Sequence, residues 1–259
     1  MANNLSTIGF AFADDREFVA AVTVLAAQAV ERLATEAGHY AIWRSRTGAE
    51  LWFHLGPEPP AGGEREILGL TPFFQGKSEI PLKVTAAVQR PTDNPFEGLL
   101  TAWVAPDETG EGAYPLSLEA VDFAAHARRE LPALWRAQIS GFARELKAFR
   151  SGAAYEESQT REPRFAAKAF IPVGLFAGAA SGNGERAPEQ ISATALLTGR
   201  VRETNLMTNE ATGRQFHWLQ VESLEATFDV VADPSVVTGE IIRGGAVEAL
   251  VQLFGRVLD

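Results

Sequence analysis

Apolar residues recur at helical spacing close to the N-terminus. The apolar stripe consists of Phe18, Val22, Leu25, Ala29 and Leu33. Intervals of three and four residues place such a stripe on one face of a helix. Asp14 or Asp15 precedes it as a candidate N-cap, and Gly38 follows it as a candidate C-terminal stop. The pattern predicts a helix that begins near Asp15 and ends at Gly38.

A second helical pattern covers Leu118–Arg150, with Ser117 before it as a candidate N-cap. Its apolar positions are Leu131, Leu134, Trp135, Ile139, Phe142, Leu146 and Phe149. Pro132 lies inside the segment, so we expect either a kinked helix or two helices that meet there.

Alternating side chains predict a β-hairpin over His39–Gly56, with Thr47-Gly48 as a two-residue turn. In that register Trp43 lies opposite Trp52 on a face away from the core. Glu50 and His54 fall on the same face as Trp52. Other predicted strands in this half are Leu5–Ala13, Ile67–Phe74, Ile80–Arg90 and Leu99–Val104.

The last part of the chain carries only strand patterns. They are Ile191–Glu203, Phe216–Ser223, Ala226–Val231 and Ala246–Leu258. A small, Gly-rich and polar stretch at 177–189 has the composition of a flexible linker. We therefore expect an α+β domain at 1–176, with N-terminal helices packed on a mainly antiparallel sheet, and a small all-β domain at 190–259.

The predicted strand order after the linker resembles an oligonucleotide/oligosaccharide-binding (OB) barrel. The resemblance rests on a first strand with "TGRV" (Thr198–Val201), a wide first loop, a meander and a closing strand that ends in "GRVL" (Gly255–Leu258). It covers about the last quarter of the chain, and Gly199 and Gly255 suit the sharp strand bends of such barrels. The resemblance implies a possible groove for single-stranded nucleic acid. Its candidate contacts are Arg200, Arg202, Arg214 and Trp218.

Charge opposes that use of the barrel. The chain carries a formal net charge of −10, which repels polyanions unless its bases gather on one face. From Ile191 onward the sequence has five basic residues against nine acidic ones. We therefore expect neither nucleic acid nor a membrane as partner. No apolar run reaches the ~20 residues that span a bilayer, and the N-terminus lacks the basic region of a signal peptide, so we expect a cytoplasmic protein.

Candidate chemistry is sparse. The chain has no cysteine and four histidines, none in a recognised metal-binding pattern, and we predict no cofactor, metal or catalytic residue. A non-catalytic binding or protein-interaction role, with a protein partner or a second copy bound at the long helix and at Trp43 and Trp52, is our first hypothesis. One alternative is a metal- or carboxylate-dependent enzyme around Glu50 and His54. The other is single-strand binding by the C-terminal barrel.

Overall fold

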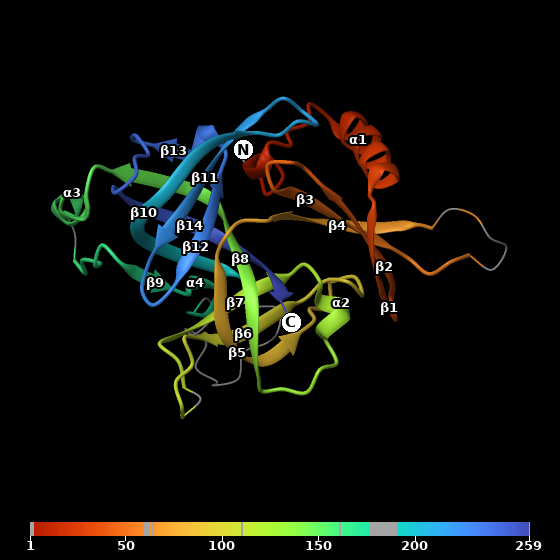
Figure 1. The fold of residues 1–259 in the computed structure, drawn as a ribbon, viewed down its shortest axis with the longest axis horizontal. Coiled ribbons are helices and arrows are strands. Elements are labelled where there is room, and N and C mark those ends of the chain that lie inside the picture. The colour runs from red at the N-terminus through yellow and green to blue at the C-terminus, as the bar shows by residue number, and fades with distance from the viewer. Residues whose placement is uncertain are drawn as a thin grey trace.

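A four-stranded antiparallel sheet is built from the N-terminal part of the chain (Figure 1). We analysed a computed structural model that describes residues 3–59, 63, 65–109, 111–160, 162–176 and 191–258. The sheet follows chain order, and the helix α1 packs beside it with the short 3-10 helix η1 before it. Their bounds are η1 Ser6–Ile8, α1 Asp15–Gln28, β1 Glu31–Thr35, β2 Gly38–Arg44, β3 Ala49–Leu55 and β4 Ile67–Phe74.

The rest of the described chain forms a ten-stranded sheet with short helices around it. Its strands are β5 Glu79–Val88, β6 Leu99–Val104, β7 Tyr114–Ala120, β8 Ala133–Phe149, β9 Ala169–Ile171, β10 Thr194–Thr208, β11 Gln215–Glu222, β12 Thr227–Ala232, β13 Val237–Thr238 and β14 Ala246–Leu258. The helical elements are α2 Phe123–His126, α3 Gly152–Ser158, α4 Val173–Phe176 and η4 Pro234–Val236.

The strand pairings close into two rings that share β8 and β14. One ring runs β5-β6-β7-β14-β8 and returns to β5. The other runs β10-β11-β12-β8-β14 and returns to β10. In each ring one pairing is parallel, β7 with β14 and β12 with β8. The units β5-β6-β7-β8 and β10-β11-β12-β14 therefore have the same pairing scheme, and each contributes its last strand to both rings.

The register identifies equivalent positions in the two units. Glu119 of β7 lies opposite Phe254 of β14, as Asp229 of β12 lies opposite Ser140 of β8. One residue further along the shared strands, Gly255 and Gly141 are equivalent. A Cβ at Gly255 would lie 2.8 Å from the Leu118 side chain, and one at Gly141 would lie 3.2 Å from Val251. Gly255 therefore allows a close approach between β14 and the parallel strand β7, and Gly141 allows one between β8 and β14.

Two hydrophobic clusters support this arrangement. One fills the interiors of the two rings of the ten-stranded sheet. The second covers both faces of the four-stranded sheet and includes Phe142 of β8 and Phe254 of β14, whose ring centroids are 4.7 Å apart. The N-terminal sheet thus packs on the two strands that the rings share.

The predicted α+β class is wrong, because strands account for 48% of the structure and helices for 15%. The helix predicted over Leu118–Arg150 is instead the end of β7, the four-residue helix α2 and the long strand β8. β8 is buried on both faces from Ala137 to Ala143, because strands of both rings surround it. A strand buried on both faces loses its two-residue alternation, and its apolar residues then match helical spacing by chance.

The N-terminal predictions were partly correct. Asp14 caps α1 by accepting hydrogen bonds from the backbone of Arg16 and Glu17, both at 2.9 Å. The helix ends at Gln28, however, and Leu33 lies in β1. The strand predicted over Leu5–Ala13 is also wrong, because η1 forms there.

The hairpin at His39–Gly56 is confirmed, but its register is one residue off. Ile42 pairs with Trp52, and Trp43 pairs with Leu51. The backbone of Ser45 donates to the carbonyl of Ala49 at 2.8 Å, so the turn is longer than Thr47-Gly48. A one-residue shift moves side chains to the other face. Trp43 and Trp52 therefore lie on opposite faces.

Several other strands agree with prediction. Ile67–Phe74, Leu99–Val104 and Ala246–Leu258 have the predicted bounds. The strands predicted at Ile80–Arg90, Ile191–Glu203, Phe216–Ser223 and Ala226–Val231 form with shifted ends. The predicted linker at 177–189 lies outside the described residues. In the part of the chain that the structure describes, no helix is both long and apolar enough to cross a membrane.

Candidate functional site

Glu50 belongs to a buried ion-pair group. Its carboxylate lies 2.5 Å from the Arg44 guanidinium and 3.5 Å from that of Arg256. It also accepts a hydrogen bond of 2.8 Å from the Trp52 indole nitrogen. The Glu50 side chain is fully buried, and buried charges are normally paired in this way. These contacts make Glu50 a structural residue that joins β2, β3 and β14.

His54 lies on the same face of β3 but has different partners. Its Nε2 is 3.2 Å from the Thr71 hydroxyl, and its Nδ1 is 3.1 Å from the Asn94 side-chain amide. Burial lowers the pKa of His54 from 6.5 to about 4, which favours the neutral imidazole. The ring of Phe96 stacks on it at 5.2 Å.

The predicted pair of Glu50 and His54 therefore does not converge on a common ligand. Glu50 contacts arginines and Trp52, whereas His54 contacts Thr71 and Asn94. Across the described residues, no group of three or more metal-ligating side chains is placed to hold a metal ion.

The tryptophan surface that we expected is not exposed. Trp43 is 8% exposed and Trp52 is 3% exposed, and both belong to the hydrophobic cluster that covers the two faces of the four-stranded sheet. Trp43 packs edge-on against Phe10, and Trp52 packs edge-on against Tyr40. Neither indole is available to a partner.

The four residues proposed for nucleic-acid contact do not form one exposed surface, because the tryptophan is buried and the three arginines are exposed. Trp218 is 5% exposed, and its indole nitrogen donates to Asp229 at 2.8 Å. Arg200, Arg202 and Arg214 are exposed, and Arg202 pairs with Glu222 at 3.0 Å. Trp218 therefore offers no exposed ring on which a base could stack beside these arginines.

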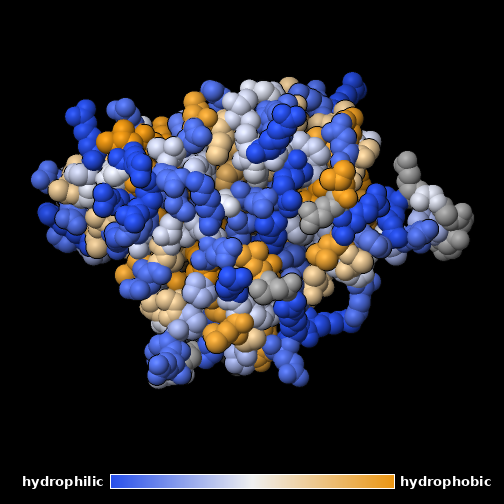
Figure 2. Space-filling model, in the orientation of Figure 1, coloured by the Kyte–Doolittle hydropathy of each residue, from blue (hydrophilic) through white to orange (hydrophobic). Residues whose placement is uncertain are grey.

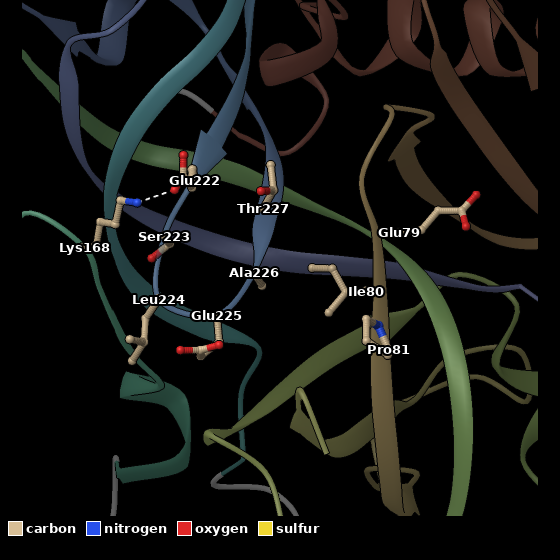
Figure 3. Close-up of a pocket in the computed structure, with 10 residues that line it drawn as sticks. All are labelled: Glu79, Ile80, Pro81, Lys168, Glu222, Ser223, Leu224, Glu225, Ala226 and Thr227. Carbon is tan, nitrogen blue, oxygen red and sulfur yellow. Dashed lines mark hydrogen bonds and ion pairs between the residues drawn. The ribbon is translucent and has the colours of Figure 1, made fainter. Parts of the chain in front are cut away.

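A groove of about 580 Å³ lies between β5 and the turn that joins β11 to β12 (Figure 3). Two of its three carboxylates have partners on neighbouring segments. Glu222 contacts Lys168 and Arg202, and Glu79 contacts Arg136 at 3.2 Å. Exposed pairs of this kind are typical of a solvated surface, so the groove gives no sign of a specific ligand.

The outer face of α1 is exposed to solvent although it is apolar and carries no charge. No charged residue occurs between Glu17 and Glu31. Within α1, all of whose residues are described, only Leu25 is buried. Val19 is 59% exposed, Val24 is 54% exposed and Val30, just after the helix, is 93% exposed. Apolar side chains, in orange, are visible at the end of the molecule where α1 lies (Figure 2).

The sequence also predicts this surface, on the helix face opposite the apolar stripe. The stripe from Phe18 to Ala29 describes the face that packs on the sheet. The opposite face carries Val19, Ala20, Thr23, Val24 and Ala27, all exposed. A helix that is apolar on all sides is normally buried on all sides. The exposed apolar face of α1 between Phe18 and Ala27 is therefore unusual.

Comparison with known proteins identifies no relative, because no protein family, curated protein or solved structure matches the chain.

Proposed function

We propose that this is a non-catalytic protein-interaction protein, and that the outer face of α1 docks a second copy of the same chain. The observation that carries the proposal is the uncharged, exposed face formed by Val19, Val24 and Val30. Surface apolar residues that occur singly need no explanation, whereas a contiguous apolar face marks an interface.

The strand that follows α1 supports a second copy as the occupant. β1 is the outer strand of its sheet and pairs only with β2 among the described residues. An unpaired strand edge is a template for pairing with another chain. A two-fold axis would bring the same α1 face and the same β1 edge together from both copies, and such isologous contacts are the commonest way in which soluble proteins dimerise.

Size explains why both elements are needed. α1 has 14 residues, so it is about 21 Å long. Stable interfaces bury roughly 800 Å² on each partner, which is more than one short helix face supplies. The absence of charge on the α1 face also removes electrostatic repulsion between two copies of a chain that carries a net charge of −10.

Native mass spectrometry and light scattering over a range of concentrations test the proposal. We expect a dimer for the wild type and a monomer for Val24→Lys, because a lysine at the centre of the contact must be desolvated without a partner. The matched control is Leu134→Lys, since Leu134 is also an exposed apolar residue, at 72%, but belongs to β8. A monomeric wild type, or a dimer that Val24→Lys leaves intact, would contradict the proposal.

A further inference from the structure

A cavity of about 1090 Å³ lies between the two sheets. One wall is the end of β1 and the turn after it, from Leu33 to Ala37. The other wall is Asp122 to Arg129, which includes α2, together with Arg256 and Val257 at the end of β14. Ligand sites are commonly found in cavities between structural units.

Three arginines line this cavity. They are Arg128, Arg129 and Arg256, beside the acidic residues Glu36 and Asp122. Arg256 is held by the buried Glu50 and by Gln138. Arg128 pairs with Glu36, and their side chains are 80% and 73% exposed, so this pair is weak and Arg128 can exchange Glu36 for another anion.

A carboxylate and an imidazole lie next to each other in the same wall. Asp122 Oδ2 accepts a hydrogen bond from the backbone of Val257 at 3.0 Å and lies 3.2 Å from His126 Nε2. The Asp122 side chain is 4% exposed, and that of His126 is 10% exposed. An ionised carboxylate only accepts hydrogen bonds. In such a contact the carboxylate accepts from Nε2–H, and Nδ1 is left as the second polar atom of the ring.

The other polar atom of each side chain has no partner. Asp122 Oδ1 and His126 Nδ1 are both buried without a hydrogen bond. Burying a polar atom without a partner is unfavourable, so two in neighbouring side chains are not explained by folding alone. Other buried carboxylates of the protein are satisfied. Asp229, for example, receives bonds from Lys77, Ser78 and Trp218.

We propose that this cavity binds a small hydroxylated anion, such as a hydroxy acid or a sugar phosphate. The Arg128 guanidinium binds its anionic group in place of Glu36, because guanidinium groups pair well with carboxylates and phosphates. Its hydroxyl group contacts Asp122 Oδ1 and His126 Nδ1 after a rotation of the His126 ring toward the cavity. A hydroxyl both donates and accepts, so it suits either protonation state of the imidazole.

Calorimetric titration of the full chain with matched ligands tests this proposal. L-malate and succinate have the same charge and chain length and differ by one hydroxyl. 3-Hydroxypropyl phosphate and propyl phosphate form a second pair, which also differs by one hydroxyl. We expect the hydroxylated member of each pair to bind about tenfold more tightly, the usual effect of one added hydrogen bond to a charged group.

Variants locate the preference. We expect Asp122→Asn and His126→Gln each to abolish the tenfold preference while leaving weak binding of all four anions. His217→Gln is the matched control, because His217 lies on β11 and does not line the cavity. It should retain the preference. The imidazole NMR signal of His126, assigned in the wild type through correlations to its own backbone amide, should shift with L-malate and not with succinate.

Three results would overturn the proposal. They are a wild-type protein that binds none of the four anions, a wild type that does not distinguish the members of either pair, and a preference that survives both substitutions. The NMR shift is measured on the wild type, so it decides the question even where a variant does not fold. Dimerisation through α1 is measured separately, and its failure does not affect these outcomes.

Discussion

The two four-strand units have the same pairing scheme but differ at the end of the third strand. Glu119 and Asp229 occupy equivalent, largely buried positions, and each is fully occupied by donors. Arg90 binds Glu119 with bonds of 3.0 and 2.9 Å, and Asp229 receives three bonds. Three residues further on, the first unit has Asp122, whereas the second has Ala232.

This difference separates framework from candidate site. Glu119 and Asp229 are equivalent carboxylates whose oxygens accept hydrogen bonds from neighbouring segments. They therefore belong to the framework that holds the rings together. Asp122 occurs in one unit only, faces the cavity between the sheets and keeps one unpaired oxygen. We therefore expect substitutions at these positions to change the free energy of unfolding by very different amounts. Each measurement can support or contradict the distinction between framework and candidate site.

The largest effect is expected at Asp229. Asp229→Ala leaves the backbone amides of Lys77 and Ser78 and the Trp218 indole without an acceptor in a buried place. We expect the free energy of unfolding to fall by about 4 kcal/mol, measured by urea denaturation followed by circular dichroism. Asp233→Ala is the control, since Asp233 is partly exposed and caps the short helix η4. Equal losses in the two variants would place Asp229 outside the framework.

The paired glycines test whether the two ring junctions are equally tight. Gly255→Ala puts a methyl group 2.8 Å from the Leu118 side chain, whereas Gly141→Ala puts one 3.2 Å from Val251. Overpacking a core costs about 1–3 kcal/mol, so we expect a loss near the upper end for Gly255→Ala and near the lower end for Gly141→Ala. Thermal unfolding measures both. The reverse order would show that Leu118 moves aside more easily than Val251.

Sequence patterns identified many strands but not how they assemble. Ile67–Phe74 is an edge strand whose first residues are exposed, and Leu99–Val104 has turn residues on both sides, so local signals are sufficient. β8 was misread because both of its faces are buried. The repeated unit was not recognised either, because the two copies share pairing and few residue types. The OB-like resemblance stays a prediction, and the ring that contains β10, β11 and β12 is closed by β8, which lies outside the stretch that suggested it.

The candidate sites depend even more on distant contacts. Glu50 and His54 were correctly placed on one face of β3, but their partners, Arg256 and Asn94, come from other elements. Asp122 and His126 are four residues apart, a spacing visible in the sequence. Their importance depends on Val257, which lies at the far end of the chain. The α1 face was readable from composition alone, as an uncharged run between Glu17 and Glu31.

The two buried imidazoles extend the comparison to pH. Both nitrogens of His54 have partners, whereas one nitrogen of His126 has none. The pKa of His54 falls from 6.5 to about 4 on burial. Between these values the unfolded chain binds more protons, so the free energy of unfolding falls as pH falls through that window. From pH 7 to pH 4.5 we expect His54 to account for a loss of about 2 kcal/mol.

Urea denaturation at several pH values measures that loss, with His54→Gln as the comparison because glutamine does not titrate. The variant should be less stable at pH 7, where His54 is neutral and bonded, and its stability should depend less on pH between 6.5 and 4. Parallel pH curves for the two proteins would show that His54 is not the group responsible.

The smallest effect is expected at Asp122, and it decides whether the comparison holds. Asp122→Asn keeps an oxygen that can accept from the Val257 backbone, and it replaces an oxygen that has no partner. We therefore expect the free energy of unfolding to change by less than about 1 kcal/mol, well below the loss at Asp229. Urea denaturation of Asp122→Asn beside Asp229→Ala gives the ratio directly. A loss at Asp122 as large as that at Asp229 would make both carboxylates part of the framework, and the unpaired oxygen would then no longer indicate a binding site.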